Sequence, residues 1–143
     1  MRYVLDTNIA VAALNLHPAV LARLEAVPAA ELGLPLLVIG ELTYGAHRSR
    51  RVAENLARIR SLRESFPVLP VTEGVIERYA VVRSELESQG RPKADFDLVI
   101  ACTALQHGAV LVTHDTALLD GAIAGLVVED WLAVGAGRDL LPR

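Results

Sequence analysis

Cysteine, lysine and long apolar runs are scarce in this chain, and each scarcity is informative. Cys102 is the one cysteine, which rules out an internal disulfide and fits a reducing cytoplasm. No apolar run approaches the roughly 20 residues that cross a bilayer, so we expect no membrane association. The N-terminus lacks the basic and apolar layout of a signal peptide. The sequence also shows no phosphate-cradling glycine loop and no Gly-flanked nucleophilic serine.

Charge is distributed unevenly along the chain. The net charge of −3 gives no sign of nucleic-acid binding by itself. Residues 45–66, however, hold six arginines against two glutamates, whereas Lys93 is the single lysine. Two interpretations stay open: a solvated helix face, or a patch facing phosphate, which the arginine fork suits. The six arginines are Arg48, Arg50, Arg51, Arg58, Arg60 and Arg63.

Short strands alternate with helices, which predicts an α/β domain with a short central parallel sheet flanked by helices in three layers. A length of 143 residues with 52% hydrophobic residues suits one domain, over 1–132, with a loose tail over 133–143. We expect a short helix from Thr116. We expect strands at 2–5, 31–34, 68–71, 109–112 and 126–128, and longer helices at 9–14, 18–26, 36–48, 52–65, 72–90 and 95–107.

Four carboxylates stand out because each interrupts apolar sequence. Asp6 ends the first strand and Asp115 follows the strand at 109–112. Parallel strands place both at the same edge of the sheet, where open α/β sheets bind ligands. Asp97 shares a helical face with apolar residues, and Glu41 lies on another apolar helical stripe. We expect these four side chains to converge in one cleft.

Such convergence needs a compensating charge. Two like charges about 4 Å apart repel by roughly 4 kcal/mol at an effective dielectric near 20. Either some acids stay protonated, or a cation neutralises them. Oxygen-only donors favour Mg²⁺, with Mn²⁺ possible, and the four histidines show no paired spacing for zinc. Such an ion activates water for attack on a phosphodiester, which makes a metal-dependent nuclease the leading hypothesis.

Each acid also has a structural interpretation. Asp6 and Asp115 suit caps for the turns or helices that follow them, and Glu41 suits a buried, hydrogen-bonded acid. Asp95 competes with Asp97 for the metal-ligand role. We expect Asp95 to be the N-cap of its helix and Asp97, in the first turn, to be the ligand.

Five segments resemble the motifs of PIN-domain proteins, in the order found in VapC-type toxins. Any one of them is weak, but together they span residues 2 to about 131. They are Val4-Leu5-Asp6-Thr7-Asn8, Val38 to Ala46 around Glu41, Asp97-Leu98-Val99-Ile100-Ala101, Leu111-Val112-Thr113-His114-Asp115 and Leu126 to Trp131.

This resemblance implies a PIN fold and a Mg²⁺-dependent endoribonuclease of a type II VapBC toxin–antitoxin system. Its metal-site acids would be Asp6, Glu41, Asp97 and Asp115, and the supporting polar positions match Asn8 and Thr113. It further implies a VapB-type antitoxin that occupies the acidic cleft, and a toxin homodimer. Ala117 stands where some members carry a further acid, so a fifth acidic contact is in doubt. The arginines of 45–66 are not motif residues.

Other functions stay in competition. A PIN-like RNA-binding module without catalysis would keep the fold and the arginine-rich residues 45–66. A structure-specific DNA nuclease would use the same metal chemistry. A receiver with an acidic pocket is disfavoured, because Thr7 follows Asp6 and no lysine follows Val112.

Overall fold

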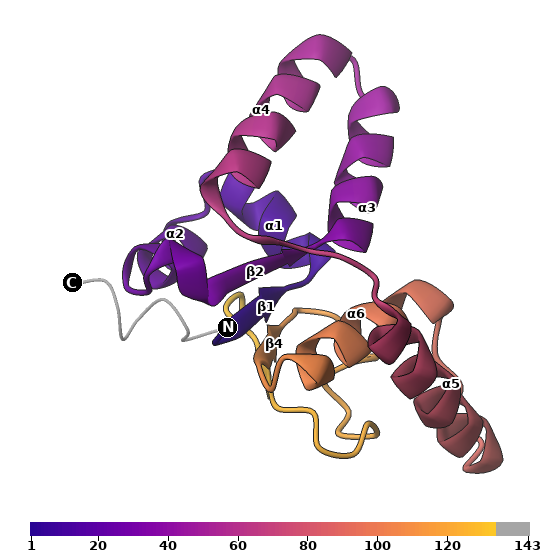
Figure 1. Ribbon diagram of the computed structural model, residues 1–143. Coiled ribbons are helices and arrows are strands. Elements are labelled where there is room, and N and C mark those ends of the chain that lie inside the picture. Colours follow the sequence, from indigo (N-terminus) through magenta and orange to yellow (C-terminus); the bar gives the residue numbers. More distant parts are fainter. Residues whose placement is uncertain (134–143) are drawn as a thin grey trace.

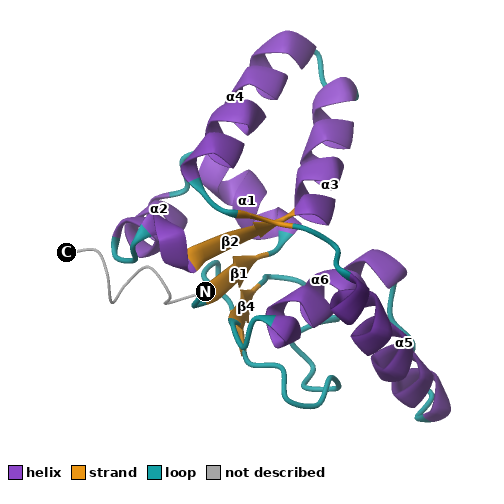
Figure 2. Cartoon of the chain, in the orientation of Figure 1, coloured by secondary structure: helices purple, strands orange, loops and turns teal. Residues whose placement is uncertain are grey.

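The computed structural model describes residues 1–133 as a parallel sheet covered by helices (Figures 1 and 2). The predicted tail, 133–143, lies outside the described residues apart from its first position. The strands are β1 (Tyr3–Leu5), β2 (Leu32–Pro35), β3 (Val68–Leu69), β4 (Val110–Val112) and β5 (Val128–Glu129). The helices are α1 (Thr7–Leu14), α2 (Pro18–Glu25), α3 (Leu36–His47), α4 (Val52–Ser65), α5 (Glu73–Ser88) and α6 (Asp95–Gln106), with a 3₁₀ turn at Ala29–Glu31.

The five strands lie in the order β3-β2-β1-β4-β5, and every neighbouring pair is parallel. β1 is the central strand, with Tyr3 beside Leu32 of β2 and beside Val110 of β4. The chain therefore winds outward in both directions from β1. The carboxyl ends of β1 and β4 lie at this switch point, the position where such sheets form ligand clefts.

Two apolar cores form because successive strand residues face opposite sides of the sheet. Val4 and Leu111 face the side covered by α3, α4 and α6. Tyr3 and Leu5 face the other side, with α1, α2 and Trp131. Trp131 is buried, with its ring against the edge of Tyr3, as expected for a core residue rather than a base-stacking platform. The predicted three-layer α/β fold is confirmed.

α3 and α4 form an antiparallel pair that extends beyond the sheet, while α5 packs on the outer side of α6 (Figure 1). α4 matches its predicted limits, and the other predicted longer helices are present with ends shifted by a few residues. Thr72 is the N-cap of α5, since its hydroxyl accepts a bond from the Val75 N–H at 3.3 Å. None of the helices in the described residues has the length and apolarity needed to cross a bilayer.

The predicted short helix from Thr116 is wrong. Residues 116–125 form a series of turns between β4 and β5. The Asp115 and Asp120 side chains accept bonds from the N–H groups of Ala117 and Ala122, which favours turns over a helical ladder. Gly121 and Gly125 have φ of 73° and 78°, a left-handed conformation that ends helices.

Candidate functional site

Asp6 lies at the centre of the site, immediately after β1. Its backbone N–H donates to the Val112 carbonyl oxygen at 2.9 Å, which fixes it against the end of β4. The residue is 4% exposed, and its carboxylate is held by two donors. Oδ1 accepts from the Thr7 N–H at 2.8 Å, and Oδ2 accepts from the buried Thr113 hydroxyl at 2.7 Å. Asp6 therefore caps α1 and lines the site as well, so its two interpretations are compatible.

Thr113 also organises the second acid at this edge. Its Oγ1 accepts from the Asp115 N–H at 3.0 Å, while its hydroxyl proton goes to Asp6. The side chain of Asp115 accepts from the Ala117 N–H at 2.9 Å, so it caps the following turn. Asn8 accepts from the His114 N–H at 3.1 Å and joins the start of α1 to the same strand end. The supporting positions Asn8 and Thr113 thus contact the backbone around the predicted site.

Two helices bring the remaining acids to this edge. α3 follows β2 directly and carries Glu41 in its second turn, and the first turn of α6 carries Asp97. The two helices contact each other, and both meet the carboxyl edge of the sheet (Figure 1). Both carboxylates are partly buried. The structure therefore brings all four predicted acids into one neighbourhood.

The pKa values show how strongly these charges interact. Burial raises the pKa of Asp97 to about 6, and the negative charges of Asp115, Asp6 and Glu41 add to the rise. Burial also raises the pKa of Asp6, against the lowering effect of its two hydrogen bonds. The pKa of Glu41 is raised by burial and by the charge of Asp6. Desolvation and mutual repulsion together favour protonation or the arrival of a cation.

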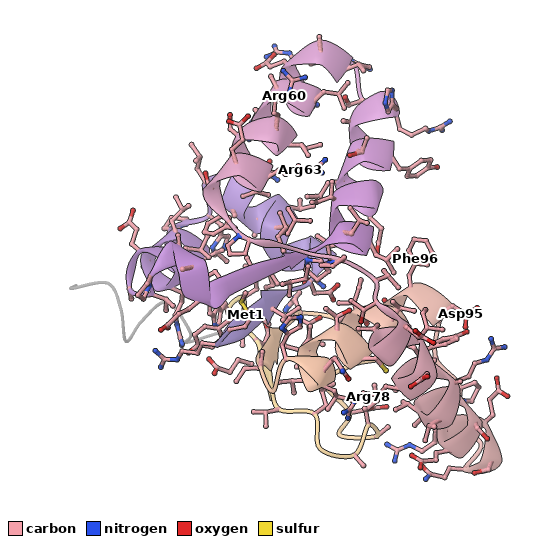
Figure 3. All side chains as sticks on the ribbon, viewed as in Figure 1. Met1, Arg60, Arg63, Arg78, Asp95 and Phe96 are labelled. Carbon is pink, nitrogen blue, oxygen red and sulfur yellow. The ribbon has the colours of Figure 1, made fainter. Side chains whose placement is uncertain are left out.

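Asp95 does not behave as predicted. The N-cap position of α6 is Ala94, and Asp95 is its first helical residue and makes no capping bond. Its exposed carboxylate accepts from the Tyr79 hydroxyl at 2.7 Å and pairs with Arg83 at 3.1 Å. Figure 3 shows Asp95 on the α5 side of α6. Asp95 therefore links α5 and α6. Asp97, two residues later, lies near the other three acids.

Two further contacts at this edge were not predicted from the sequence. Within residues 1–133 the buried Thr7 Oγ1 has no partner in full hydrogen-bond geometry. It nevertheless lies close enough to Glu41 to lower the pKa of that carboxyl. The His114 Nδ1 lies 2.9 Å from Asp130, which follows β5. The adjacency of Thr7 to Asp6 was a usable signal, but the pairing of His114 with Asp130 depends on strand order.

The donor chemistry fits a hard divalent ion. No three His, Cys, Asp or Glu side chains of residues 1–133 already stand in metal-ligating geometry. Mg²⁺ does not require such a cage, because it retains several waters and uses one or two carboxylates together with substrate phosphate. Neighbouring carboxylates raise one another's pKa values, and a divalent ion between them stabilises their charged form. The residues present therefore suit Mg²⁺ or Mn²⁺.

A groove adjoins the acidic cluster between α1, α3 and α4. Its volume is about 210 Å³, and its walls are mainly apolar. Thr7 and Glu41 line it, as does Arg58 of α4. All six arginines of residues 45–66 are exposed, and Figure 3 shows Arg60 and Arg63 on α4. The groove thus joins Glu41, one of the four acids, to Arg58, one of the six arginines of residues 45–66.

Comparison with known proteins identifies the architecture. The PIN domain family model matches residues 3–123, a span that contains all four acids. The chain belongs to the PIN-domain family. Ribonuclease VapC1 of Haemophilus influenzae strain R2866 is 33% identical, over 92% of this chain and 98% of that protein. The tRNA(fMet)-specific endonuclease VapC of Shigella flexneri is 30% identical, with the same coverage.

Solved structures of PIN-domain toxins share the fold. VapBC2 from Rickettsia felis, crystallised on a DNA fragment from its promoter, matches with a TM-score of 0.83 and 29% identity, over 92% of this chain and 99% of that one. VapBC-1 from nontypeable Haemophilus influenzae matches with a TM-score of 0.82 and 32% identity, over 93% and 100%. The PIN fold predicted from the five sequence motifs is confirmed.

Proposed function

We propose that this PIN-domain protein is a Mg²⁺-dependent endoribonuclease, with Mn²⁺ as an alternative ion, and the toxin of a VapBC-type toxin–antitoxin system. The observation that carries the proposal is the convergence of four carboxylates from separate parts of the chain at the carboxyl edge of the sheet, where burial and the other three acids raise the pKa of Asp97 to about 6. Relatives with ribonuclease activity in their names support the reaction class. The four acids are the proposed metal ligands.

The chain's own residues would divide the work at the sheet edge. Asp6, Glu41, Asp97 and Asp115 would hold the ion and its waters. Thr113 and Asn8 fix the strand end, because Thr113 bonds to Asp6 and to the Asp115 N–H. When bound, the ion would neutralise the scissile phosphate and lower the pKa of the attacking water. The exposed arginines of 45–66 would contact the RNA backbone as bidentate phosphate ligands.

Cleavage of a structured RNA with and without the ion tests the proposal. We expect wild-type protein to cut in Mg²⁺ and in Mn²⁺, to lose activity in EDTA, and to recover it when Mg²⁺ is restored. Asp97→Asn should be inactive under all of these conditions, whereas Asp95→Asn, the matched control two residues away, should cut normally. Equal cleavage by wild type and Asp97→Asn, or cleavage that persists in EDTA, would refute the metal mechanism.

The same assay separates the alternatives. An RNA-binding module without catalysis would retain RNA on a filter in Mn²⁺ and leave it intact. A structure-specific DNA nuclease would cut a DNA hairpin in preference to an RNA hairpin of the same sequence. The proposal requires that the RNA is cut in Mn²⁺, and that the RNA hairpin is cut in preference to the DNA hairpin.

We also propose a VapB-type antitoxin partner and a homodimer, acting in the cytoplasm, where RNA is available. The structural relatives that were crystallised as VapBC complexes support the partner. Exposed apolar side chains on α3 and α6, namely Leu36, Tyr44 and Phe96, supply surface for self-association. Light scattering on the isolated protein tests the dimer: wild type should scatter as a dimer and Phe96→Glu as a monomer.

Co-expression with the adjacent reading frame tests the antitoxin partner, which should co-purify with this protein and suppress RNA cleavage.

A further inference from the structure

Lys93 is almost fully buried beside the acidic cluster. It precedes α6, and its side chain is 5% exposed. The ammonium donates to Asp120 Oδ2 at 2.8 Å and to the carbonyl oxygen of Ala117. Burying an ammonium group is costly unless its hydrogen bonds are satisfied. This lysine therefore contributes to a specific connection between the segment before α6 and the loop after β4.

The connection joins the two segments that carry Asp97 and Asp115, two of the proposed metal ligands. Lys93 lies four residues before Asp97, and its acceptors lie two and five residues after Asp115. Ala117 is held at both of its backbone polar groups: its N–H donates to Asp115 Oδ1, and its carbonyl oxygen accepts from Lys93. The ammonium thus bonds to the same short turn that the Asp115 carboxylate caps.

Side-chain contacts hold the 115–125 loop in place. Residues 116–125 form turns and bends without a helical or sheet ladder, and two of them, Leu118 and Ile123, are buried in the core. Asp120 is the second contact with Lys93, and it also caps its own turn by accepting from the Ala122 N–H at 3.0 Å. Arg91 also reaches Asp120, at 3.5 Å from its carbonyl oxygen and 3.7 Å from its carboxylate, but the Arg91 side chain is 46% exposed. The contact of the largely buried Lys93 side chain therefore restricts the polar side of the loop, while Leu118 and Ile123 pack into the core.

Electrostatics supports a link between Lys93 and the site. The Lys93 charge lowers the pKa of Asp97, in opposition to the three neighbouring acids. A fixed positive charge also repels a divalent ion. Lys93 therefore affects metal affinity in two opposite ways. The geometric part, its hold on the loop beside the ligands, strengthens metal binding, and the Coulombic part, its positive charge, weakens it.

We infer that Lys93 is a positioning residue, whose bonds to Ala117 and Asp120 set the separation between Asp97 and Asp115 before the divalent ion binds. This inference rests on the proposed function, because it assigns Lys93 to the same metal site. Side chains that orient metal ligands typically contribute about 10–100-fold to metal affinity. The geometric part is thus expected to outweigh the Coulombic part, and loss of Lys93 to weaken metal binding.

Direct Mn²⁺ binding, followed by electron paramagnetic resonance, tests this at pH 7.5 on folded protein. Lys93→Met keeps the aliphatic length and removes the ammonium. We expect its Mn²⁺ dissociation constant to rise about 10-fold. The Mg²⁺ concentration for half-maximal cleavage should rise equally, with the KM for RNA unchanged, which a general loss of stability would not produce. Lys93→Arg should recover most of the affinity.

Asp120→Asn loosens the connection from its other end, because it removes the charged acceptor while the Lys93 ammonium and its bond to Ala117 remain. It should weaken Mn²⁺ binding in the same direction, and the double variant should be no worse than Lys93→Met alone. Asp120 is partly exposed, so this variant decides the matter if Lys93→Met does not fold. Arg91→Met, which removes the neighbouring exposed cation, is the control and should change binding less than about twofold.

Two outcomes overturn the inference. Wild-type Mn²⁺ affinity, or tighter binding, in Lys93→Met and Asp120→Asn would show that the ammonium does not position the ligands. Equal weakening by Arg91→Met would show that Lys93 has no special positioning role, because loss of a positive charge alone would tighten the binding of a divalent ion. Failure of the wild-type protein to bind Mn²⁺ or to cut RNA would instead refute the proposed function, and would be recognised before any variant is compared.

Discussion

Asp97 combines partial burial with three negative neighbours, so its charge is costly to the metal-free protein. Asp97→Asn keeps the shape and removes that charge. We expect the variant to lose RNA cleavage completely. Its melting temperature in EDTA should be unchanged or raised by about 2–4 °C, which corresponds to roughly 1 kcal/mol. Calorimetry beside the cleavage assay checks both, and a drop in melting temperature would show that Asp97 stabilises the fold.

The pKa of Asp97 also gives stability a definite pH dependence. Its folded-state pKa, about 6, lies above the ordinary aspartate pKa of 3.8. Between these values the folded state binds more protons than the unfolded state, so the free energy of unfolding falls as pH rises through this window. Asp6 and Glu41, with raised pKa values, act in the same direction. We expect metal-free wild type to lose stability relative to Asp97→Asn between about pH 4 and pH 6.

Thermal unfolding in EDTA across this range measures the difference between the two proteins. Mg²⁺ at pH 7.5 should reverse the loss for wild type and leave Asp97→Asn nearly unaffected, because a ligand stabilises only the state that binds it. Parallel curves for the two proteins at every pH would contradict the assigned shift.

At the residue scale, the sequence was sufficient to select the four acids. Each interrupts apolar sequence, and the fold places them together. Their role as metal ligands stays a prediction. Asp95 was assigned wrongly as an N-cap because its partners, Tyr79 and Arg83, lie on α5, at a distance along the chain that a local pattern does not register. The Lys93 contacts span 24 and 27 residues and were invisible for the same reason.

At the scale of elements, α4 offers the clearest test of RNA binding, because Arg58 lines the groove that also contains Glu41. In an Asp97→Asn background, which prevents cleavage, we expect Arg58→Gln to weaken RNA binding about 3–10-fold. The slope of log K against log salt should fall by about 0.7 for a single strand. Fluorescence anisotropy at several salt concentrations measures both quantities.

Arg83→Gln is the matched control for Arg58. Arg83 is also exposed on a helix, but it pairs with Glu87 and Asp95 on the α5 side. It should bind RNA like the parent protein. An equal loss in both variants would indicate general electrostatic attraction and leave α4 without a special role.

Elements with strong periodicity were predicted well, and those governed by turns were not. α4 has its predicted limits, and α5 begins one residue after its predicted start at 72. The segment after Asp115 looked helical because of its alanines and leucines. Side-chain bonds from Asp115 and Asp120, together with left-handed glycines, override that propensity. The order of the strands, which brings β4 beside β1, was not encoded in any single motif.

At the scale of the whole molecule, Cys102 reports on global opening. It is fully buried in α6, and burial raises the pKa of its thiol to about 11. Thiol reagents react with thiolates, so labelling requires the core to open. We expect negligible labelling of native protein, a rate that rises with urea, and slower labelling in Mg²⁺. Absorbance with a chromogenic disulfide reagent measures this, and a rapid burst with native protein would contradict it.

The arrangement of strands has a consequence for synthesis on the ribosome. β1 emerges first and is the central strand, but its neighbour β4 is made more than a hundred residues later. Until that late strand inserts, neither Asp115 nor the Thr113 hydroxyl that holds Asp6 is in place. A nascent or truncated chain without β4 therefore lacks a complete acidic cleft.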